Sequence, residues 1–433
     1  MICDGRPSFL RSACLGALVL GPFLGLSGPA QAQPLTIPRF DFSFSNPGAR
    51  SLGLGGAFAA LADDATAAYA NPAGLVQLTE AEVSVEARLW GRSPTFLAGG
   101  RFDGQPSGSG VDTDSTILVG RDRSEDLGPS FVSLVLPKKR WCFALYGHQT
   151  AKFRQMAESQ GFFFDDEFEP GGVGRFPATR ESVDLEVTSL GAAAGWRFND
   201  GWSLGLGLVF SDTSLDTRTD AFLPDDDSPA AQTGPISFLP ERRLSTTTVR
   251  AKGTQVTVTG GLLWRPSERF SAGLFYRQGA EVDGSYEVET GPVLPFEDRF
   301  STRAVFSVPT VAGAGVAYRC AGGRLTLAAE VDRVSYSGLV EIVENDEVSV
   351  EGREYQDAWD YRAGAELALL RRSPILAFRT GIWIEDNGQD LLRKDFTHYT
   401  AGLGLAAESF QIDLGADLSE EIDTLSLSFI YRL

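Results

Sequence analysis

The strongest constraint in this sequence is a two-residue alternation of apolar and polar side chains that recurs along most of the chain. In the last ten residues, TLSLSFIYRL, apolar side chains occupy every second position from Leu425 to Leu433, and serine, threonine or arginine fills most positions between them. A period of two predicts a β-strand, since successive side chains of a strand point to opposite faces. One face therefore suits lipid and the other suits a polar lumen.

Segments with this alternation predict fourteen strands, which is an even number. They lie near residues 82–90, 129–136, 141–151, 183–198, 202–217, 246–264, 270–286, 302–319, 324–337, 357–370, 375–385, 396–407, 410–418 and 422–433. Tight turns, such as 199–201 and 265–268, alternate with long loops, notably 91–128, 152–182 and 218–245. Outer-membrane barrels have short periplasmic turns and long extracellular loops. We therefore predict an all-β fold, a 14-stranded antiparallel transmembrane β-barrel over residues 81–433.

Aromatic residues near the strand ends favour this barrel over a soluble β-sandwich or propeller, whose strands alternate too. Trp90, Trp141, Trp196, Trp202 and Tyr431 are examples, and they would form the interfacial girdles of a membrane barrel. The apolar residues at every second position back from the C-terminus are also similar to the signal that barrel-assembly machinery recognises, although leucine replaces the usual terminal phenylalanine. We expect that machinery to be a partner during biogenesis, and outer-membrane lipid and lipopolysaccharide to surround the barrel.

The first 32 residues predict a secretory signal peptide. Arg6 and Arg11 precede an apolar run, and Ala30 and Ala32 occupy the positions that a signal peptidase reads. Beyond this segment no run approaches the ~20 apolar residues that a membrane-spanning helix requires, so any crossing of a membrane must use strands. The predicted location is the outer membrane of a Gram-negative-type bacterium.

Composition argues against several other functions. The formal net charge is −19, without a basic patch, which argues against a nucleic-acid partner. The two histidines, His148 and His398, lie in no recognisable serine or cysteine context, so we predict that the protein is not an enzyme. The acidic clusters lack the spacing of a calcium loop, and we predict no metal and no cofactor. Cys142 and Cys320 fall on distant strands and are predicted to be unpaired.

Residues 33–80 precede the first strand and contain the stretch LGLGGAFAALADDATAAYANPAG, which is rich in small residues. A barrel of fourteen strands has a lumen too wide for its own wall side chains to fill, so we predict that this segment forms a plug, or hatch. Asp63 and Asp64 predict a helix start, because acidic side chains are favoured at helix N-termini. Pro72 predicts the helix end, since the residue before a proline avoids the α conformation.

The segment GLGGAFAALADDATAAYANPAG, together with VPTVAGAGVAYR and LTLAAEVDRVSYSG in late strands, resembles the outer-membrane long-chain fatty-acid transporter family, the FadL and TodX group. The resemblance implies a barrel blocked by a hatch that ends in Asn71, Pro72 and Ala73. It also implies passive uptake of hydrophobic molecules: capture in an extracellular groove, transfer to a pocket beside the hatch, and exit through a hatch shift and a gap at a kinked strand. The corresponding strand begins at Trp141, and Gly147 is its candidate weak point.

Two of the long loops carry candidate capture surfaces. The loop 152–182 contains Phe162, Phe163, Phe164, Phe168 and Phe176, which either form an exposed apolar binding surface or fold down over the barrel mouth. Its cations, Arg175 and Arg180, would meet a carboxylate. The loop 218–245 offers Ile236, Phe238 and Leu239 beside Arg242 as a second candidate site.

The function that the resemblance implies is passive transport of long-chain fatty acids, or similar lipids or hydrocarbons, across the outer membrane. The alternative is a related barrel that shuttles or anchors secreted proteins at the cell surface. An apolar interior would favour transport, and a filled interior would favour the second function.

Overall fold

The structure is a computed structural model that describes residues 40, 42, 45–166, 172–344, 347–349, 355–370, 373–386 and 395–433. The chain divides into two units, Met1–Leu35 and Thr36–Leu433, and every described residue belongs to the second. The account below therefore concerns that unit alone.

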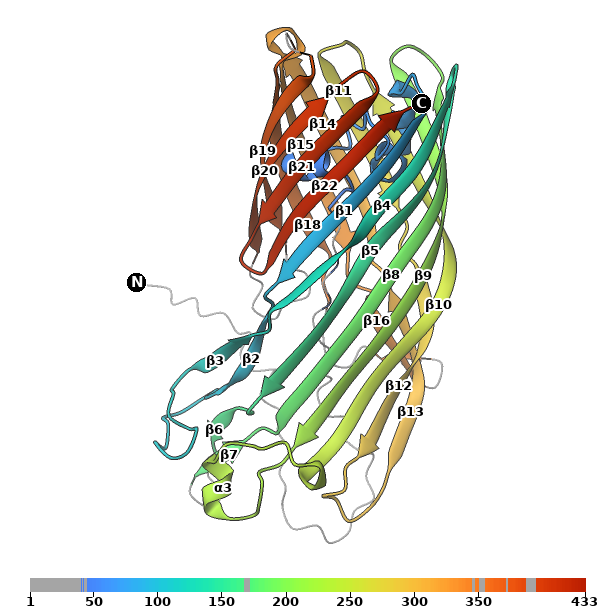
Figure 1. The fold of residues 1–433 in the computed structure, drawn as a ribbon. Helices are drawn as coiled ribbons and strands as arrows, with labels where there is room; N and C mark the ends of the chain where they lie inside the picture. The colour runs from blue at the N-terminus through green and yellow to red at the C-terminus, as the bar shows by residue number, and fades with distance from the viewer. Residues whose placement is uncertain are drawn as a thin grey trace, which may run out of the picture. The chain divides into compact units, whose positions relative to one another are not determined.

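Fourteen wall strands form one closed antiparallel barrel, as predicted from the alternation (Figure 1). The uninterrupted strands are β1 (Glu82–Arg92), β4 (Ser124–Lys138), β5 (Trp141–Ser159), β8 (Ala178–Arg197), β9 (Trp202–Phe222), β10 (Arg243–Trp264), β18 (Ala358–Ala368), β19 (Ile375–Glu385), β20 (Phe396–Ala406), β21 (Phe410–Leu418) and β22 (Ile422–Arg432). Three wall strands are divided: β11 (Phe270–Arg277) with β12 (Glu281–Thr290), β14 (Thr310–Cys320) with β13 (Arg299–Ser307), and β15 (Leu325–Ser335) with β16 (Val340–Glu344). β1 closes the barrel because it pairs with both β22 and β4.

The wall is much taller on one side than on the other. The strands β8, β9 and β10 have 20, 21 and 22 residues, whereas β18, β19 and β20 have 11 each. Figure 1 shows the tall strands running past the short ones toward the end of the barrel that carries the long loops. We call this the long-loop end, and the opposite end, with turns such as 139–140 and 265–269, the tight-turn end.

Sequence alternation located each wall strand but ended several of them too early. β5 runs to Ser159 instead of residue 151, and β9 runs to Phe222 instead of residue 217. Charged side chains such as Arg154 and Glu158 stand on the β5 extension, where they interrupt the apolar alternation. Two strands predicted as continuous, 270–286 and 302–319, are interrupted, the second at Pro309, whose nitrogen cannot donate to a strand ladder. A third wall strand continues as β16, beyond the predicted end at residue 337.

The long loops contain short elements that the sequence did not predict. They are β2 (Thr95–Gly100), β3 (Ile117–Arg121), β6 (Phe163–Asp165), β7 (Val173–Arg175), α3 (Pro229–Thr233), η3 (Pro240–Arg242) and β17 (Glu347–Ser349), and η4 (Ala321–Gly323) forms one tight turn. β2 pairs with β3, and β6 pairs with β7.

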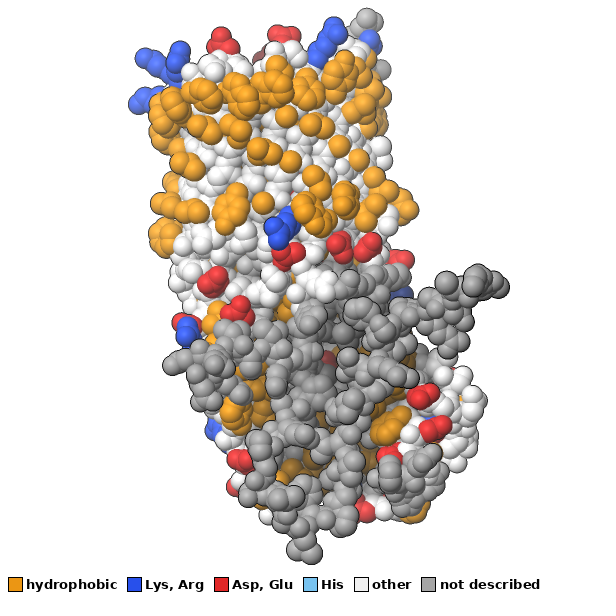
Figure 2. Space-filling model, turned by 180° about the vertical axis from the view of Figure 1, so that it is seen from behind, with side chains coloured by type: hydrophobic (Ala, Val, Ile, Leu, Met, Phe, Trp, Pro, Cys, Tyr) orange, Lys and Arg blue, Asp and Glu red, His pale blue; other side chains and the backbone are white. Residues whose placement is uncertain are grey.

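Outward-facing apolar side chains form a band across the wall near the tight-turn end, on the face that Figure 2 shows. Leu204, Leu206 and Leu208 on β9 are exposed on the outer face of the barrel. Tryptophans stack near the tight-turn end, with ring centroids 5.6 Å apart in both the Trp141–Trp196 and the Trp202–Trp264 pair, which is the place of an interfacial girdle. Among the described residues there is no helix long and apolar enough to span a membrane.

The hatch lies inside the barrel near the tight-turn end. It contains α1 (Ala49–Gly53), α2 (Ala67–Ala70) and η2 (Pro72–Gln77). The helix after Asp64 is only four residues long, because the Asp64 carboxylate accepts hydrogen bonds from the Thr66 amide (2.9 Å) and hydroxyl (2.6 Å) and so forms a turn first. Pro72 ends α2 and also begins η2, where its missing N–H costs nothing.

Candidate functional site

Asn71 forms hydrogen bonds both within the hatch and between the hatch and the wall. The residue is 0% exposed. Its amide nitrogen Nδ2 donates to the carbonyl oxygens of Ala59 (2.8 Å) and of Leu262 on β10 (3.3 Å), and its Oδ1 accepts from the Ala73 amide (3.1 Å). Each of its polar atoms is therefore used, and a shift of the hatch at Asn71 must break these bonds together.

Three wall glycines allow the hatch backbone to approach at this point. Gly195, Gly205 and Gly261 are cross-strand partners on β8, β9 and β10. A Cβ atom on Gly205 would lie 2.2 Å from the Pro72 carbonyl carbon and from the Ala73 nitrogen. Only glycine leaves room for such a contact between two backbones.

A chain of ion pairs holds the other side of the hatch. Arg50 of α1 pairs with Asp63 (2.6 Å) and with the wall residue Glu366 (2.9 Å), and its side chain is 13% exposed. Glu366 also pairs with Arg379 (2.7 Å), which pairs with Asp413 (2.7 Å). Each of these charges lies beside an opposite charge, which offsets the free-energy cost of removing it from water.

The remaining hatch contacts also go to inward-facing wall charges. Asp63 pairs with Arg319 of β14 (3.1 Å), and Asp64 lies 3.6 Å from Arg50. The carboxylate of Glu330 on β15 accepts hydrogen bonds from the amides of Phe58 (2.8 Å) and Ala59 (2.6 Å). The predicted gating residue Asp63 thus belongs to the interface between hatch and wall, whereas Asp64 contacts Arg50 and Thr66 of the hatch itself.

Toward the long-loop end, the inner surface of the tall side carries a cluster of apolar side chains, with Thr213 and Thr217 of β9 on the same face. The apolar side chains share the strand face of Gly195, Gly205 and Gly261 and are all buried: Val183, Leu185 and Val187 on β8, Leu215 on β9, and Val249 and Ala251 on β10. We call these six residues the inner apolar wall. Nearby, Phe306 of β13 packs on Phe40 and Phe42, with ring centroids 5.4 and 6.2 Å apart.

The predicted capture residues of the two loops come together in one assembly. Phe163 is 1% exposed, Phe162 and Phe164 are half-buried, and Phe176 is 40% exposed and packs on Phe164 (4.7 Å between centroids). Ile236 and Phe238 are buried in a cluster with Ala178 and Phe222, and Leu239 is half-buried. Phe168 lies outside the described residues.

The predicted cations bind atoms of these loops. Arg175 donates to the carbonyl oxygens of Gln160 (2.7 and 3.0 Å) and Gly234 (2.7 Å), and burial lowers the pKa of Arg175 to about 10. Arg180 pairs with Glu158 (2.7 Å) and lies over the Phe238 ring (4.8 Å). Arg242 pairs with Asp227 (2.9 Å). Arg175 and Arg180 therefore join the first loop to the second.

The family model described as outer membrane protein transport protein (OMPP1/FadL/TodX) matches residues 30–416. The chain belongs to this family. A FadL homologue from Pseudomonas aeruginosa is 17% identical, with 92% of this chain and 100% of that chain covered and a TM-score of 0.64. The toluene transporters TbuX of Ralstonia pickettii and TodX of Pseudomonas putida are 14% identical and cover 90% of this chain and 99% of their own, with TM-scores of 0.60 and 0.58. No curated protein matches the chain at the level of sequence.

This FadL/TodX-family chain is thus an outer-membrane transporter of hydrophobic compounds. Its tight-turn end faces the periplasm and its long-loop end faces outward, as in other outer-membrane barrels. The family membership and the closed barrel agree with the location and the fold class predicted from the sequence.

The predicted weak point Gly147 lies beside the end of a strand ladder in this family member. β4 pairs with β5 only from Lys138↔Trp141 to Phe131↔His148, so Gly147 is within the second-to-last pair. Beyond His148, β5 pairs with β8 alone and its register shifts between Gln149 and Ala151. The wall between β4 and β5 therefore lacks a backbone ladder toward the outside.

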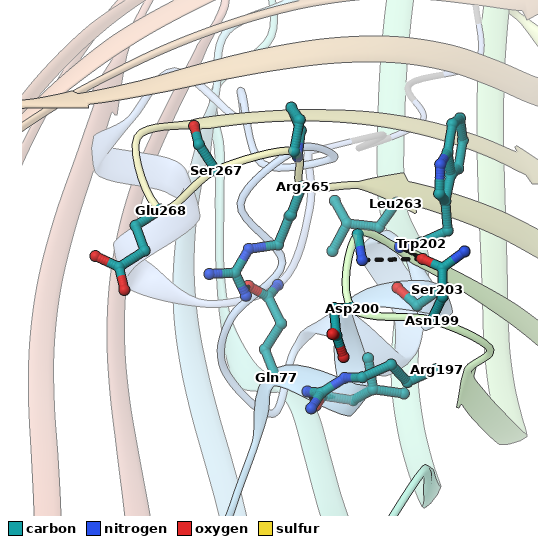
Figure 3. A pocket seen from close by; sticks show the side chains of 13 residues that line it. Gln77, Arg197, Asn199, Asp200, Trp202, Ser203, Leu263, Arg265, Ser267 and Glu268 are labelled. Atoms are coloured by element: carbon teal, nitrogen blue, oxygen red, sulfur yellow. Dashed lines mark hydrogen bonds between the residues drawn. The ribbon is translucent and has the colours of Figure 1, made fainter.

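A cavity of about 350 Å³ opens at the periplasmic end, where sequence reasoning predicted no site (Figure 3). The end of the hatch, the turn between β8 and β9, and the turn between β10 and β11 line it. Arg197 and Arg265 enter it from the wall, and Gln77 enters it from the hatch. The sequence feature that could have indicated this cavity is the presence of arginines at the periplasmic ends of the lumen-facing rows of side chains.

Proposed function

We propose that this protein takes up long-chain fatty acids, or similar lipids and hydrocarbons, by passive diffusion. A molecule would bind first at the assembly of the loops 152–182 and 218–245, where Phe176 offers an exposed ring. It would then pass along the inner apolar wall and leave when the hatch around Asn71, Pro72 and Ala73 rearranges.

The observation that carries this proposal is the division of the lumen into an apolar and a charged side. The inner apolar wall lies on the tall strands, whereas Glu366, Arg379 and Asp413 lie on the short ones and pair with each other or with the hatch. Apolar surface attracts a hydrophobic molecule with roughly 25 cal/mol for each Å² removed from water. Because the charged side chains are already paired with one another, a hydrophobic molecule is expected to move along the apolar side of the lumen.

Exit through the wall has support in the strand pairing. Where the β4–β5 ladder ends, the Met156 amide of β5 donates to Asp122, which precedes β4 (2.9 Å), and Lys152 of β5 lies near Asp126 of β4 (3.7 Å). A cavity of about 20 Å³, lined in part by Phe153 and Arg92, lies at this place. We propose that ligand leaves sideways here once the hatch has shifted.

We also propose that the outer leaflet, with its lipopolysaccharide, contacts the apolar band. Leu425, Leu427 and Phe429 on β22 are exposed on the outer face. The same alternating face, which ends at Leu433, would serve as the signal for barrel-assembly machinery.

We expect Leu185→Gln to lower the affinity for a hydrophobic ligand by roughly tenfold or more. Leu185 is fully buried on the inner apolar wall, beside its cross-strand partner Leu215. An amide there would be buried beside the ligand without a hydrogen-bond partner, and the ligand would lose a contact worth about 1.5–3 kcal/mol. Titration of the purified barrel with dodecanol or laurate measures the effect.

The control is Glu186→Gln, which changes the next residue on the outward face of β8. It should leave ligand affinity unchanged, and both variants should run as folded barrels in unheated gels. Equal affinity in the wild type and in Leu185→Gln would contradict the proposed path. Co-purification of secreted proteins, with no hydrophobic ligand bound, would favour the shuttle or scaffold function instead.

A further inference from the structure

The periplasmic cavity lies directly beneath the contact between the hatch and the wall glycines. Arg197 and Ser203 are cross-strand partners, and so are Ser203 and Leu263. These three residues stand one lumen-facing position closer to the periplasm than Gly195, Gly205 and Gly261, on the same three strands. On β8, β9 and β10, the cavity therefore lies one level closer to the periplasm than the contact between the hatch and the wall glycines.

The side chains that line the cavity also fasten the end of the hatch. Arg265 Nη1 donates to Gln77 Oε1 (2.7 Å), and Arg197 donates to the Val76 carbonyl oxygen. Gln77 in turn donates to the Leu61 carbonyl oxygen (2.6 Å). The Ser203 hydroxyl donates to the carbonyl oxygen of Ala73 (2.9 Å), so one cavity residue bonds directly to the gating segment.

The arginines of the cavity retain capacity for an anion. Arg265 Nε is buried and has no hydrogen-bond partner among the described residues. Burial, together with the charges of Arg319 and Arg197, lowers the pKa of Arg265, while the charges of Asp63 and Glu268 act in the opposite direction. Asp200 and Glu268 also line the cavity (Figure 3), but both are exposed, so water screens their charges.

We propose that this cavity binds the carboxylate of an amphiphilic molecule and that binding detaches the end of the hatch. A carboxylate forms charge-assisted hydrogen bonds roughly twice as strong as those of neutral acceptors, so it would displace the Val76 carbonyl and the Gln77 amide oxygen from the guanidinium groups. Val76 and Leu263 supply apolar surface for the adjoining carbons. At roughly 30 Å³ for each water-sized group, the volume holds about ten non-hydrogen atoms.

This inference rests on the proposed function and deepens it, because it assigns an anionic head group to the cargo. An anionic amphiphile in the cavity would shift the hatch, which is the step that precedes the sideways exit proposed above. A neutral hydrocarbon would lack this effect. The carboxylate has two sources, the cargo itself or a small carboxylate of the periplasm, and the test uses a probe for each.

The test compares octanoate, octanol and acetate on the purified full-length barrel. Calorimetric titration gives the affinities, and hydrogen exchange of residues 72–78 reports detachment of the hatch end. We expect octanoate to bind more tightly than octanol and to speed exchange.

Arg265→Gln should lower octanoate affinity about tenfold or more while octanol affinity stays the same, since hydrogen bonds to charged groups are the strong ones. Arg265→Lys should restore part of the preference.

The matched control is Arg269→Gln, which removes a charge from the same turn but does not line the cavity. It should leave the preference for octanoate intact. Equal binding of octanoate and octanol to every variant, or equal effects of Arg265→Gln and Arg269→Gln, would overturn the inference while leaving hydrophobic transport in place. Binding of neither probe would instead overturn the proposed function. Faster exchange with acetate alone would support the carboxylate site and assign it to small periplasmic anions.

Discussion

Gly205→Ala should turn a closed barrel into a leaking one. The new Cβ atom would lie 2.2 Å from backbone atoms of Pro72 and Ala73, which no rotation of a side chain can relieve. Overpacking of this kind costs about 1–3 kcal/mol, which shifts the docking equilibrium of the hatch by roughly 5- to 150-fold. We expect a corresponding rise in ion conductance across planar bilayers and in the sensitivity of cells to large antibiotics.

Gly260→Ala is the control for this prediction, since Gly260 belongs to the neighbouring strand at the same level. Its Cβ would lie 3.8 Å from Leu206 Cδ2 on the lipid side, an ordinary contact. The control should conduct like the wild type. A tight barrel in Gly205→Ala would show that the hatch is not seated against β9 as described.

Arg50→Gln should loosen the hatch more than any other single charge removal at this interface. Arg50 joins Asp63 to Glu366, and both carboxylates would lose their main hatch-side partner. Breaking a buried ion pair by removing one partner costs about 3–5 kcal/mol, because the other charge stays buried and uncompensated. Hydrogen exchange of residues 49–70 should therefore rise strongly while exchange of the wall strands stays slow.

Arg250→Gln provides the comparison. Arg250 pairs with Asp216 at a similar distance, 3.1 Å, but both side chains are 56% exposed. Exposed pairs contribute little to stability, so hatch exchange should match the wild type. Equal exchange in Arg50→Gln and the wild type would mean that the ion pairs do not hold the hatch.

The wall could be predicted from the sequence because lipid on one side and a lumen on the other impose the alternation seen in Leu425 to Leu433. The parts of β5 beyond residue 151 and of β9 beyond residue 217 could not, since charged side chains such as Arg154 and Arg218 break the apolar alternation there. The plug was predictable from lumen width and from the small residues before Asn71. Its short helices were not, because Asp64 forms a local turn with Thr66 that competes with the helix.

The arrangement of the loops was beyond sequence reasoning for a different reason. Arg180 and Phe238 are far apart in the chain, and only the pairing of β8 with β9 brings their loops together. Phe163 is buried, as expected if the phenylalanines fold down over the barrel mouth, whereas Phe176 keeps an exposed ring. The cavity at Arg265 forms where the end of the hatch contacts two turns of the wall, and no local sequence pattern predicts that contact.

The measurement that tests the account most directly is hydrophobic uptake with the hatch locked to the wall. A Cβ atom on Gly315 would lie 3.5 Å from the Cβ atom of Ala59, so cysteines at these two positions meet the spacing of a disulfide. In vesicles containing the double-cysteine barrel, uptake of a fluorescent fatty acid should stop on oxidation and return on reduction. Undiminished uptake with the disulfide formed would contradict transport through hatch rearrangement.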